Sequence, residues 1–165
     1  HDNMLVGLFS HEIGQWLSEN FTEKDRHRSF EIEGHTLTFH LMPDKSHQAI
    51  EHLTQLLEKG EKRIDLSLFA LSHPKLIQKL ENSSAKVHAV LDSGQGNRKR
   101  KEIPHRLSNG YELMHQKCAL IDRHTAIVGS ANWSKSAFRS NQDFLLIIEN
   151  LTPKEAKAFE ARLGF

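Results

Sequence analysis

One short segment of the chain combines the functional groups that phosphodiester cleavage requires. His115 and Lys117 are two positions apart, so on a strand both side chains would project from the same face. A neutral imidazole can attack phosphorus, and an ammonium group offsets the charge of the non-bridging oxygens. Ser130 and Asn132 can donate hydrogen bonds to those oxygens, while Gly129 would let the backbone approach a ligand closely. The segment therefore indicates phosphoryl transfer by positioning and charge.

The spacing of these residues matches a known signature. The segment reads HQKCALIDRHTAIVGSAN over 115–132, so its fixed positions follow the order H-x-K, four residues, D, six residues, G-S-x-N. This pattern resembles the signature of the phospholipase D superfamily. A chance match at all six fixed positions is on the order of one in a million for a chain of this length. The resemblance implies a phospholipase D-like α/β domain and a phosphohistidine intermediate on His115, with neither a metal ion nor another cofactor.

The resemblance also suggests roles for two carboxylates. Asp122 would be a structural or supporting carboxylate near the phosphate site. Asp143 would accept a hydrogen bond from the second ring nitrogen of His115, which would fix the tautomer of the ring. The catalytic residues predicted in this way are His115, Lys117, Asp122 and Asp143, and the predicted substrate-binding residues are Gly129, Ser130 and Asn132.

Composition limits the other classes to which this chain could belong. Its 165 residues fit one ordinary domain with a sizeable core, and 38% hydrophobic with 26% charged residues is typical of a globular chain. No apolar run approaches the roughly 20 residues that cross a bilayer. The single cysteine, Cys118, excludes a disulfide framework, and it should face away from Lys117 on a strand. A net charge of +1 means that any electrostatic attraction of a substrate must be local.

The apolar pattern predicts alternating strands and helices around this segment. Strands are expected over 30–42 (as a hairpin), 63–71, 86–91, 114–121, 125–129 and 143–149. Helices are expected after Ser10, from Asp44 or Ser46 to Gly60, from Pro74 to Leu80, and from Thr152 to Leu163. Residues 92–104 break the pattern and read as an exposed loop. This order predicts an α/β fold whose mixed, largely parallel sheet is flanked by helices.

The beginning of the chain is similar to its own end. Asp2 aligns with Asp143, and Ser10 aligns with Thr152 as a helix cap when one gap is allowed. The apolar residues between and after these positions also correspond. The pattern therefore predicts that the same acid, strand, cap and amphipathic helix are encoded twice, about 141 residues apart, as in a repeat.

This similarity bears on domain organisation and on the reaction. We interpret residues 1–28 as the strand and helix of a preceding repeat unit plus a linker, and residues 29–165 as the phospholipase D-like domain. The mechanism needs a second histidine, which protonates the leaving oxygen and later activates water. An upstream half of the protein or a homodimer partner would supply that second unit.

The sequence is compatible with two classes of substrate, nucleic acids and phospholipids. The resemblance over residues 30–165 is to compact members, which include bacterial endonucleases and mitochondrial cardiolipin-type hydrolases. Four consecutive cations at 98–101 favour a nucleic-acid backbone, although an aromatic content of only 7% gives few stacking surfaces. A phospholipid, the alternative substrate, would need an apolar entry. A third possibility is a non-catalytic member that binds phosphate or a partner.

Overall fold

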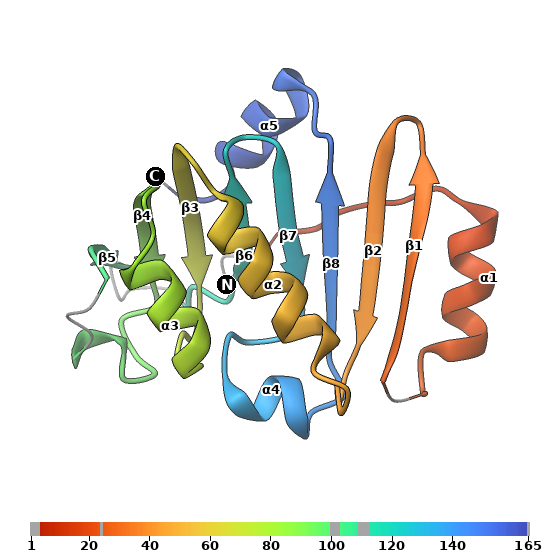
Figure 1. Cartoon of the computed structure of the whole chain (residues 1–165), viewed down its shortest axis with the longest axis horizontal. Coiled ribbons are helices and arrows are strands. Elements are labelled where there is room, and N and C mark those ends of the chain that lie inside the picture. Colours follow the sequence, from red (N-terminus) through yellow and green to blue (C-terminus); the bar gives the residue numbers. More distant parts are fainter. Residues whose placement is uncertain (1–3, 24, 100–102, 109–112, 165) are drawn as a thin grey trace.

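A single mixed β-sheet organises the chain. The computed structural model describes residues 4–23, 25–99, 103–108 and 113–164. Within them, eight strands form a sheet in the order β1-β2-β8-β7-β6-β3-β4-β5 (Figure 1). The strands are β1 (Arg26–Ile32), β2 (His35–Leu41), β3 (Arg63–Leu68), β4 (Lys86–Leu91), β5 (His105–Leu107), β6 (Lys117–Ile121), β7 (Thr125–Gly129) and β8 (Phe144–Glu149).

The α/β class and the mixed sheet are confirmed, but the sheet is not largely parallel. Only the β3–β4 and β4–β5 pairs are parallel among the described strands. The other neighbouring pairs are antiparallel. The reason is local, because three residues join β6 to β7 and so short a connection permits only an antiparallel pair. The β3–α3–β4 crossover is the part that follows the expected parallel arrangement.

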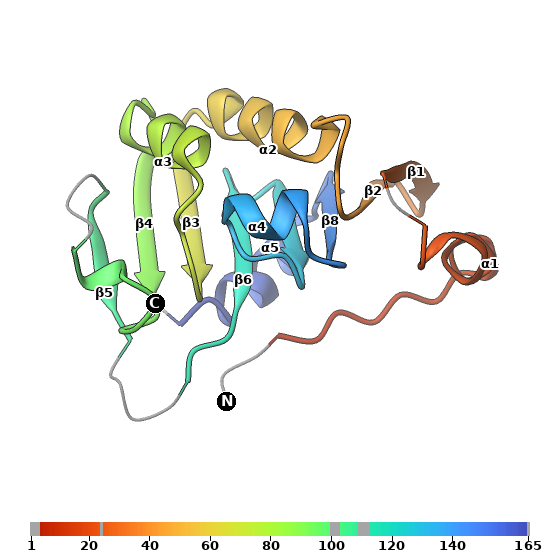
Figure 2. The ribbon, with the colours of Figure 1, turned by 90° about the horizontal axis from the view of Figure 1, so that it is seen from below.

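Helices cover both faces of the sheet. They are α1 (His11–Asn20), α2 (Gln48–Lys59), α3 (Pro74–Glu81), α4 (Lys135–Arg139) and α5 (Pro153–Glu160), with a short 3-10 helix, η1 (Asn97–Lys99). Figure 2 shows α2 and α3 on one side of the sheet, and α5 with the N-terminal segment on the other. None of the helices in the described ranges is long and apolar enough to cross a membrane.

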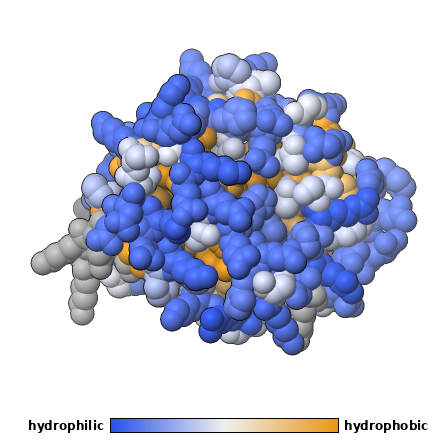
Figure 3. All heavy atoms as spheres, in the orientation of Figure 1, coloured by the Kyte–Doolittle hydropathy of each residue, from blue (hydrophilic) through white to orange (hydrophobic). Residues whose placement is uncertain are grey.

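Alternating side chains divide the core into two clusters. On β6, Ala119 and Ile121 join the cluster beneath α2 and α3, whereas Cys118 and Leu120 join the cluster on the opposite face. This two-residue period is what a strand imposes when both of its faces are covered. The prediction that Cys118 faces away from Lys117 is confirmed, and the thiol is buried. Figure 3 shows that the outer surface over α2, α3 and α4 is mainly hydrophilic.

The N-terminal region differs in part from expectation. Ser10 caps α1 as predicted, because its hydroxyl accepts a hydrogen bond from the Ile13 amide at 3.3 Å. Residues 4–10, however, form no strand and cross the second face of the sheet in extended form. Leu5 and Phe9 of this segment are 96% and 101% exposed. Asp2, which was aligned with Asp143, lies outside the described residues.

The residues of the motif, from His115 to Asn132, lie partly at one edge of the sheet, where several strands begin or end. Because β6 is antiparallel to β3 and β7, its first residue lies beside their last residues. Lys117 is the register partner of Leu68, and Gly129 is the partner of Leu145. The start of β6 and the ends of β3 and β7 therefore meet at the same edge, where β4 also ends.

Candidate active site

His115 and Lys117 stand together where β6 begins. Lys117 is the first residue of β6, and His115 lies just before the strand with an exposed side chain. The Lys117 side chain is 6% exposed, and its Nζ donates a hydrogen bond to the backbone oxygen of His115 at 2.8 Å. The ammonium group is therefore held directly beside the residue that carries the imidazole.

The charges around this pair favour a neutral imidazole. Desolvation lowers the pKa of His115 below its ordinary 6.5, and the nearby Lys117 charge lowers it further, although Asp92 opposes both effects. Burial also lowers the pKa of Lys117, and the carboxylate of Asp143 partly offsets that shift. Near neutral pH the imidazole can therefore present a free electron pair.

Ser130 links the end of β7 to the start of β8. Its hydroxyl donates to Asp143 Oδ1 at 2.7 Å and accepts a hydrogen bond from the Phe144 amide at 3.1 Å. Asp143 was expected to hold the second ring nitrogen of His115. No such hydrogen bond occurs among the described residues, and the contact of Asp143 is with Ser130. The carboxylate thus acts on the site through that hydroxyl and through its charge near Lys117.

Gly129 is required by the packing of two strands. A Cβ atom at this position would lie 2.2 Å from the backbone oxygen of Phe144 and 3.1 Å from the Cα of Leu145. The close approach that the structure describes is to β8, and it allows Ser130 and Asp143 to meet. Gly129 also lines the cavity beside the motif, where the approach of its backbone to a ligand stays a prediction.

The residues after Ser130 attach the motif to the loop that follows β3. The side-chain oxygen Oδ1 of Asn132 is buried and has no hydrogen-bond partner among the described residues. The next residue, Trp133, is fully buried, and its amide donates to the Ala70 oxygen at 3.1 Å. Its carbonyl accepts from the amides of Ser72 and His73, both at 2.8 Å. Asn132 is therefore fixed in place, and among the described residues it makes no hydrogen bond to His115.

Asp122 is not brought to this site. It lies at the opposite end of β6, and its carboxylate accepts hydrogen bonds at 2.8 Å from three backbone amides, those of Glu61, Lys62 and Arg63. Burial alone would raise its pKa, but these hydrogen bonds outweigh burial and lower it. A strand of five residues separates the two ends by about 15 Å. Asp122 therefore fixes the turn before β3 and does not lie near the phosphate site as expected.

Two residues that the sequence did not single out, Asp92 and Asn97, also lie at this edge. Asp92, at the end of β4, accepts a hydrogen bond from the Met114 amide at 3.3 Å. The fully buried Asn97 donates through Nδ2 to the backbone oxygens of Phe69 and Asp92, at 2.9 and 3.0 Å. The available signal was positional, because Asp92 is the first polar residue after a buried strand of a parallel pair.

A small cavity opens beside the motif. It has a volume of about 220 Å³ and is lined by Met4, His115, Gln116, Lys117, Cys118, Val128, Gly129 and Ser130. The described residues include no group of three or more His, Cys, Asp or Glu side chains placed to hold a metal ion. The polar groups at the cavity include the His115 imidazole, the Lys117 ammonium and the Ser130 hydroxyl, which is bonded to a carboxylate.

A family model described as "Cardiolipin synthase, PLD-like domain" matches residues 53–163, which is more than half of the chain. The chain belongs to the phospholipase D superfamily. Its curated relatives include the mitochondrial cardiolipin hydrolases of Homo sapiens and Mus musculus. The human protein is 32% identical over 115 residues, 62% of this chain and 45% of that protein. The mouse protein is 30% identical over 116 residues, 64% of this chain and 52% of that protein. The chain thus spans about half the length of these relatives.

Two solved structures share the fold. The phospholipase D family member Nuc from Salmonella typhimurium aligns with a TM-score of 0.68 at 20% identity, covering 78% of this chain and 91% of that one. NucT from Helicobacter pylori aligns with a TM-score of 0.63, also at 20% identity, covering 78% and 93%. At this identity the similarity concerns the fold, and the chemistry must be argued from the residues of this chain.

Proposed function

We propose that this chain supplies a phosphodiesterase site in which His115 is the nucleophile. The observation that carries the proposal is the meeting of an exposed imidazole with a buried ammonium group, whose Nζ lies 2.8 Å from the His115 backbone oxygen. Both residues line one cavity with Ser130. A neutral nucleophile beside a fixed positive charge is suited to attack on an anionic phosphodiester.

The reaction has two steps. A ring nitrogen of His115 bonds to phosphorus while the phosphorus–oxygen bond to the leaving group breaks, and a second histidine gives that oxygen its proton. Water then attacks the phosphohistidine and passes a proton to the second histidine. The phosphorus–nitrogen bond breaks, and a phosphomonoester leaves. Lys117 stabilises the charge on the non-bridging oxygens in both steps, so the scheme needs no metal ion.

The second histidine comes from another phospholipase D-like unit. We place that unit upstream, with residues 1–28 as its tail plus a linker, although residues 4–10 of that tail are extended and form no strand. A homodimer partner is the alternative. One similarity supports the upstream assignment: Ser10 caps α1 in the same way that Thr152 caps α5. In each case the hydroxyl accepts a hydrogen bond from the backbone amide three residues later. A contiguous exposed apolar segment such as residues 4–9 is also typical of a surface that another unit covers.

Nucleic acid is the substrate class that we propose. The support is the position of Arg98, the first cation of the basic run, because it directly follows Asn97, which is bonded to both Phe69 and Asp92. Residues 100 and 101 of the run lie outside the described residues. Arg98 is exposed, although its Nε donates to the Ser93 oxygen at 2.7 Å. A cation at the position of Arg98 would attract the phosphates of a nucleic-acid backbone without reading base sequence.

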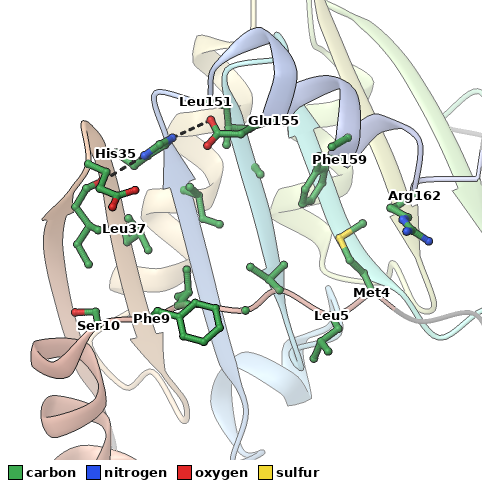
Figure 4. Close-up of a pocket in the computed structure, with 18 residues that line it drawn as sticks. Met4, Leu5, Phe9, Ser10, His35, Leu37, Leu151, Glu155, Phe159 and Arg162 are labelled. Atoms are coloured by element: carbon green, nitrogen blue, oxygen red, sulfur yellow. Dashed lines mark hydrogen bonds and ion pairs between the residues drawn. The ribbon is translucent and has the colours of Figure 1, made fainter.

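A phospholipid is the second candidate, and one observation favours it. Met4 lines the cavity at the motif and also two larger cavities on the second face, of about 590 and 380 Å³. Figure 4 shows Met4, Leu37 and Phe159 around the largest of these, with the His35–Glu155 pair at one side. Apolar space next to a phosphate site suits an acyl chain.

Cleavage assays in EDTA separate these possibilities. The whole natural gene product is incubated with labelled single-stranded DNA, phosphatidylcholine or cardiolipin, and His115→Asn serves as the inactive control. We expect cleavage of DNA, loss of all turnover in the variant and an unchanged circular dichroism spectrum. Preferential lipid hydrolysis would select the second candidate. Turnover retained in His115→Asn, or lost in EDTA, would refute the mechanism, and phosphate binding without turnover would mark a non-catalytic member.

The position of the second unit is tested separately. The mass of the natural gene product and a search of its upstream coding sequence for a second H-x-K motif answer the question directly. A product near 38 kDa with two motifs is expected, roughly twice the 18.9 kDa of this chain. A natural product of about 19 kDa that forms a dimer would replace the upstream unit by a homodimer partner.

A further inference from the structure

We infer that Phe69 is a positioning residue that orients the His115 ring and keeps the Lys117 side chain charged and in place. The inference rests on the proposed function, because it concerns the nucleophile and the cation of that site. Phe69 directly follows β3 and is partly buried. It carries no group that could react, so its effect must pass through its neighbours.

The backbone of Phe69 is fixed on both sides. Its amide donates to the backbone oxygen of Gln116 at 2.7 Å, and Gln116 is the residue between the nucleophile and the cation. Its carbonyl accepts from Nδ2 of the fully buried Asn97 at 2.9 Å. The amide of Trp133 donates to the oxygen of the next residue, Ala70. The backbone that carries the Phe69 ring is therefore held by hydrogen bonds to three different segments of the site.

The side chain touches both functional groups. The Phe69 ring centroid lies 4.9 Å from that of His115 at an interplanar angle of 66°, which is an edge-to-face contact. The Nζ of Lys117 lies over the same Phe69 ring, 5.0 Å from its centroid, within the range of a cation–π interaction. One aromatic side chain thus contacts the nucleophile and the cation together.

This contact takes the place that a carboxylate was expected to occupy. The His115 ring makes no hydrogen bond among the described residues, and Asp143 is bonded to Ser130. Without a hydrogen bond, packing against Phe69 is what limits rotation of the exposed imidazole. A wider range of ring orientations would reduce the fraction of molecules aligned for attack on phosphorus.

The effect on Lys117 is electrostatic. The Lys117 residue is buried, and burial disfavours the charged form of its side chain. The negative face of an aromatic ring favours that form again. Leucine at position 69 would keep most of the apolar volume and lose the aromatic ring. This substitution therefore separates the contribution of apolar packing from the electrostatic contribution of the ring.

The test compares Phe69→Leu with Phe69→Tyr, which retains the ring, and with Phe30→Leu, which changes a buried phenylalanine on β1, away from the site. In NMR titrations of Lys117 Nζ, Phe69→Leu should lower the pKa by about half a unit, the shift expected for loss of one cation–π contact. Phe69→Tyr and Phe30→Leu should leave this pKa unchanged. On DNA, Phe69→Leu should lower kcat about five- to tenfold, with little change in KM, and should shift the alkaline limb of the pH–rate profile.

Each result decides something. Wild-type kcat and an unmoved Lys117 titration in Phe69→Leu, with activity abolished in His115→Asn, would overturn the inference and leave the proposed function standing. Retained turnover in His115→Asn would refute the proposed function, and the Lys117 titration would then decide the Phe69 contact alone. If Phe69→Leu does not fold, Phe69→Met serves in the same comparison. Equal losses of kcat in Phe69→Leu and Phe30→Leu would indicate a general effect of packing and would also overturn the inference.

Discussion

Replacing Gly129 by alanine should disrupt the junction between β7 and β8. The added Cβ would lie 2.2 Å from the Phe144 backbone oxygen, whereas such contacts are essentially never shorter than 3.0 Å. The strands must therefore separate by about 0.8 Å, the difference between these two distances. The obstacle is backbone and not the end of a flexible side chain, so no rotamer change can relieve it.

The expected loss of stability follows from what the strands share at this point. Overpacking of a well-packed region costs about 1–3 kcal/mol. The Phe144 oxygen also accepts from the amides of Ser130 and Ala131, at 3.1 and 3.3 Å, and each such hydrogen bond contributes about 1 kcal/mol. Reduced freedom of the unfolded chain returns about 0.4–1 kcal/mol. The free energy of unfolding should therefore fall by about 2–4 kcal/mol.

Urea unfolding followed by tryptophan fluorescence measures this change, with Gly14→Ala as the matched control. Gly14 lies inside α1, and an added Cβ there would meet nothing within 4 Å. Alanine at that helical position should raise the free energy of unfolding by about 0.5–1 kcal/mol. The same substitution is thus expected to have opposite effects at the two sites. A neutral or stabilising Gly129→Ala would refute the packing argument.

Two further predictions concern stability. His40 is buried, its Nε2 lies 3.0 Å from Nδ1 of His52, and burial lowers its pKa to about 3. Below about pH 6.5 this imidazole therefore binds a proton in the unfolded chain but stays neutral in the folded chain. The free energy of unfolding should for this reason fall by about 2 kcal/mol between pH 7 and pH 5. His40→Phe should remove that contribution, and an unchanged pH slope would contradict it. Asp122→Asn should cost about 2–3 kcal/mol in urea unfolding without moving the His115 titration, since Asp122 lies at the opposite edge; a shifted titration would contradict this placement.

Apolar periodicity was enough to predict most of the elements. It gave the β1–β2 hairpin, the capped helices α1 and α5, and the end of α2 at Gly60, because each depends on residues close in the sequence. It did not give β5 or α4, which have three and five residues and too short a pattern to detect. Strand direction also escaped prediction, since it depends on which strands become neighbours across the sheet.

The site was predictable where spacing along one hairpin decided it, and unpredictable where separate segments met. His115, Lys117 and Ser130 line one cavity as the motif suggested. The contact of Phe69 with the first two depends on the pairing of β3 with β6, which no local pattern encodes. The bond between Ser130 and Asp143 similarly depends on the pairing of β7 with β8.

The spacing of the motif itself has a geometric cause. Lys117 begins β6, Asp122 begins the turn, and Gly129 ends β7. The four residues between Lys117 and Asp122 therefore form the rest of β6, and the six between Asp122 and Gly129 complete the turn and most of β7. The register pairs Ala119 with Ile127, and continuing it by two residues sets Lys117 opposite Gly129. The hairpin thus returns the G-S segment to the edge where H-x-K begins. The aspartate at its far end anchors the turn to the backbone before β3. One signature therefore spans both ends of a hairpin, and under the proposed function only the side chains at the end with His115 and Lys117 would reach phosphorus.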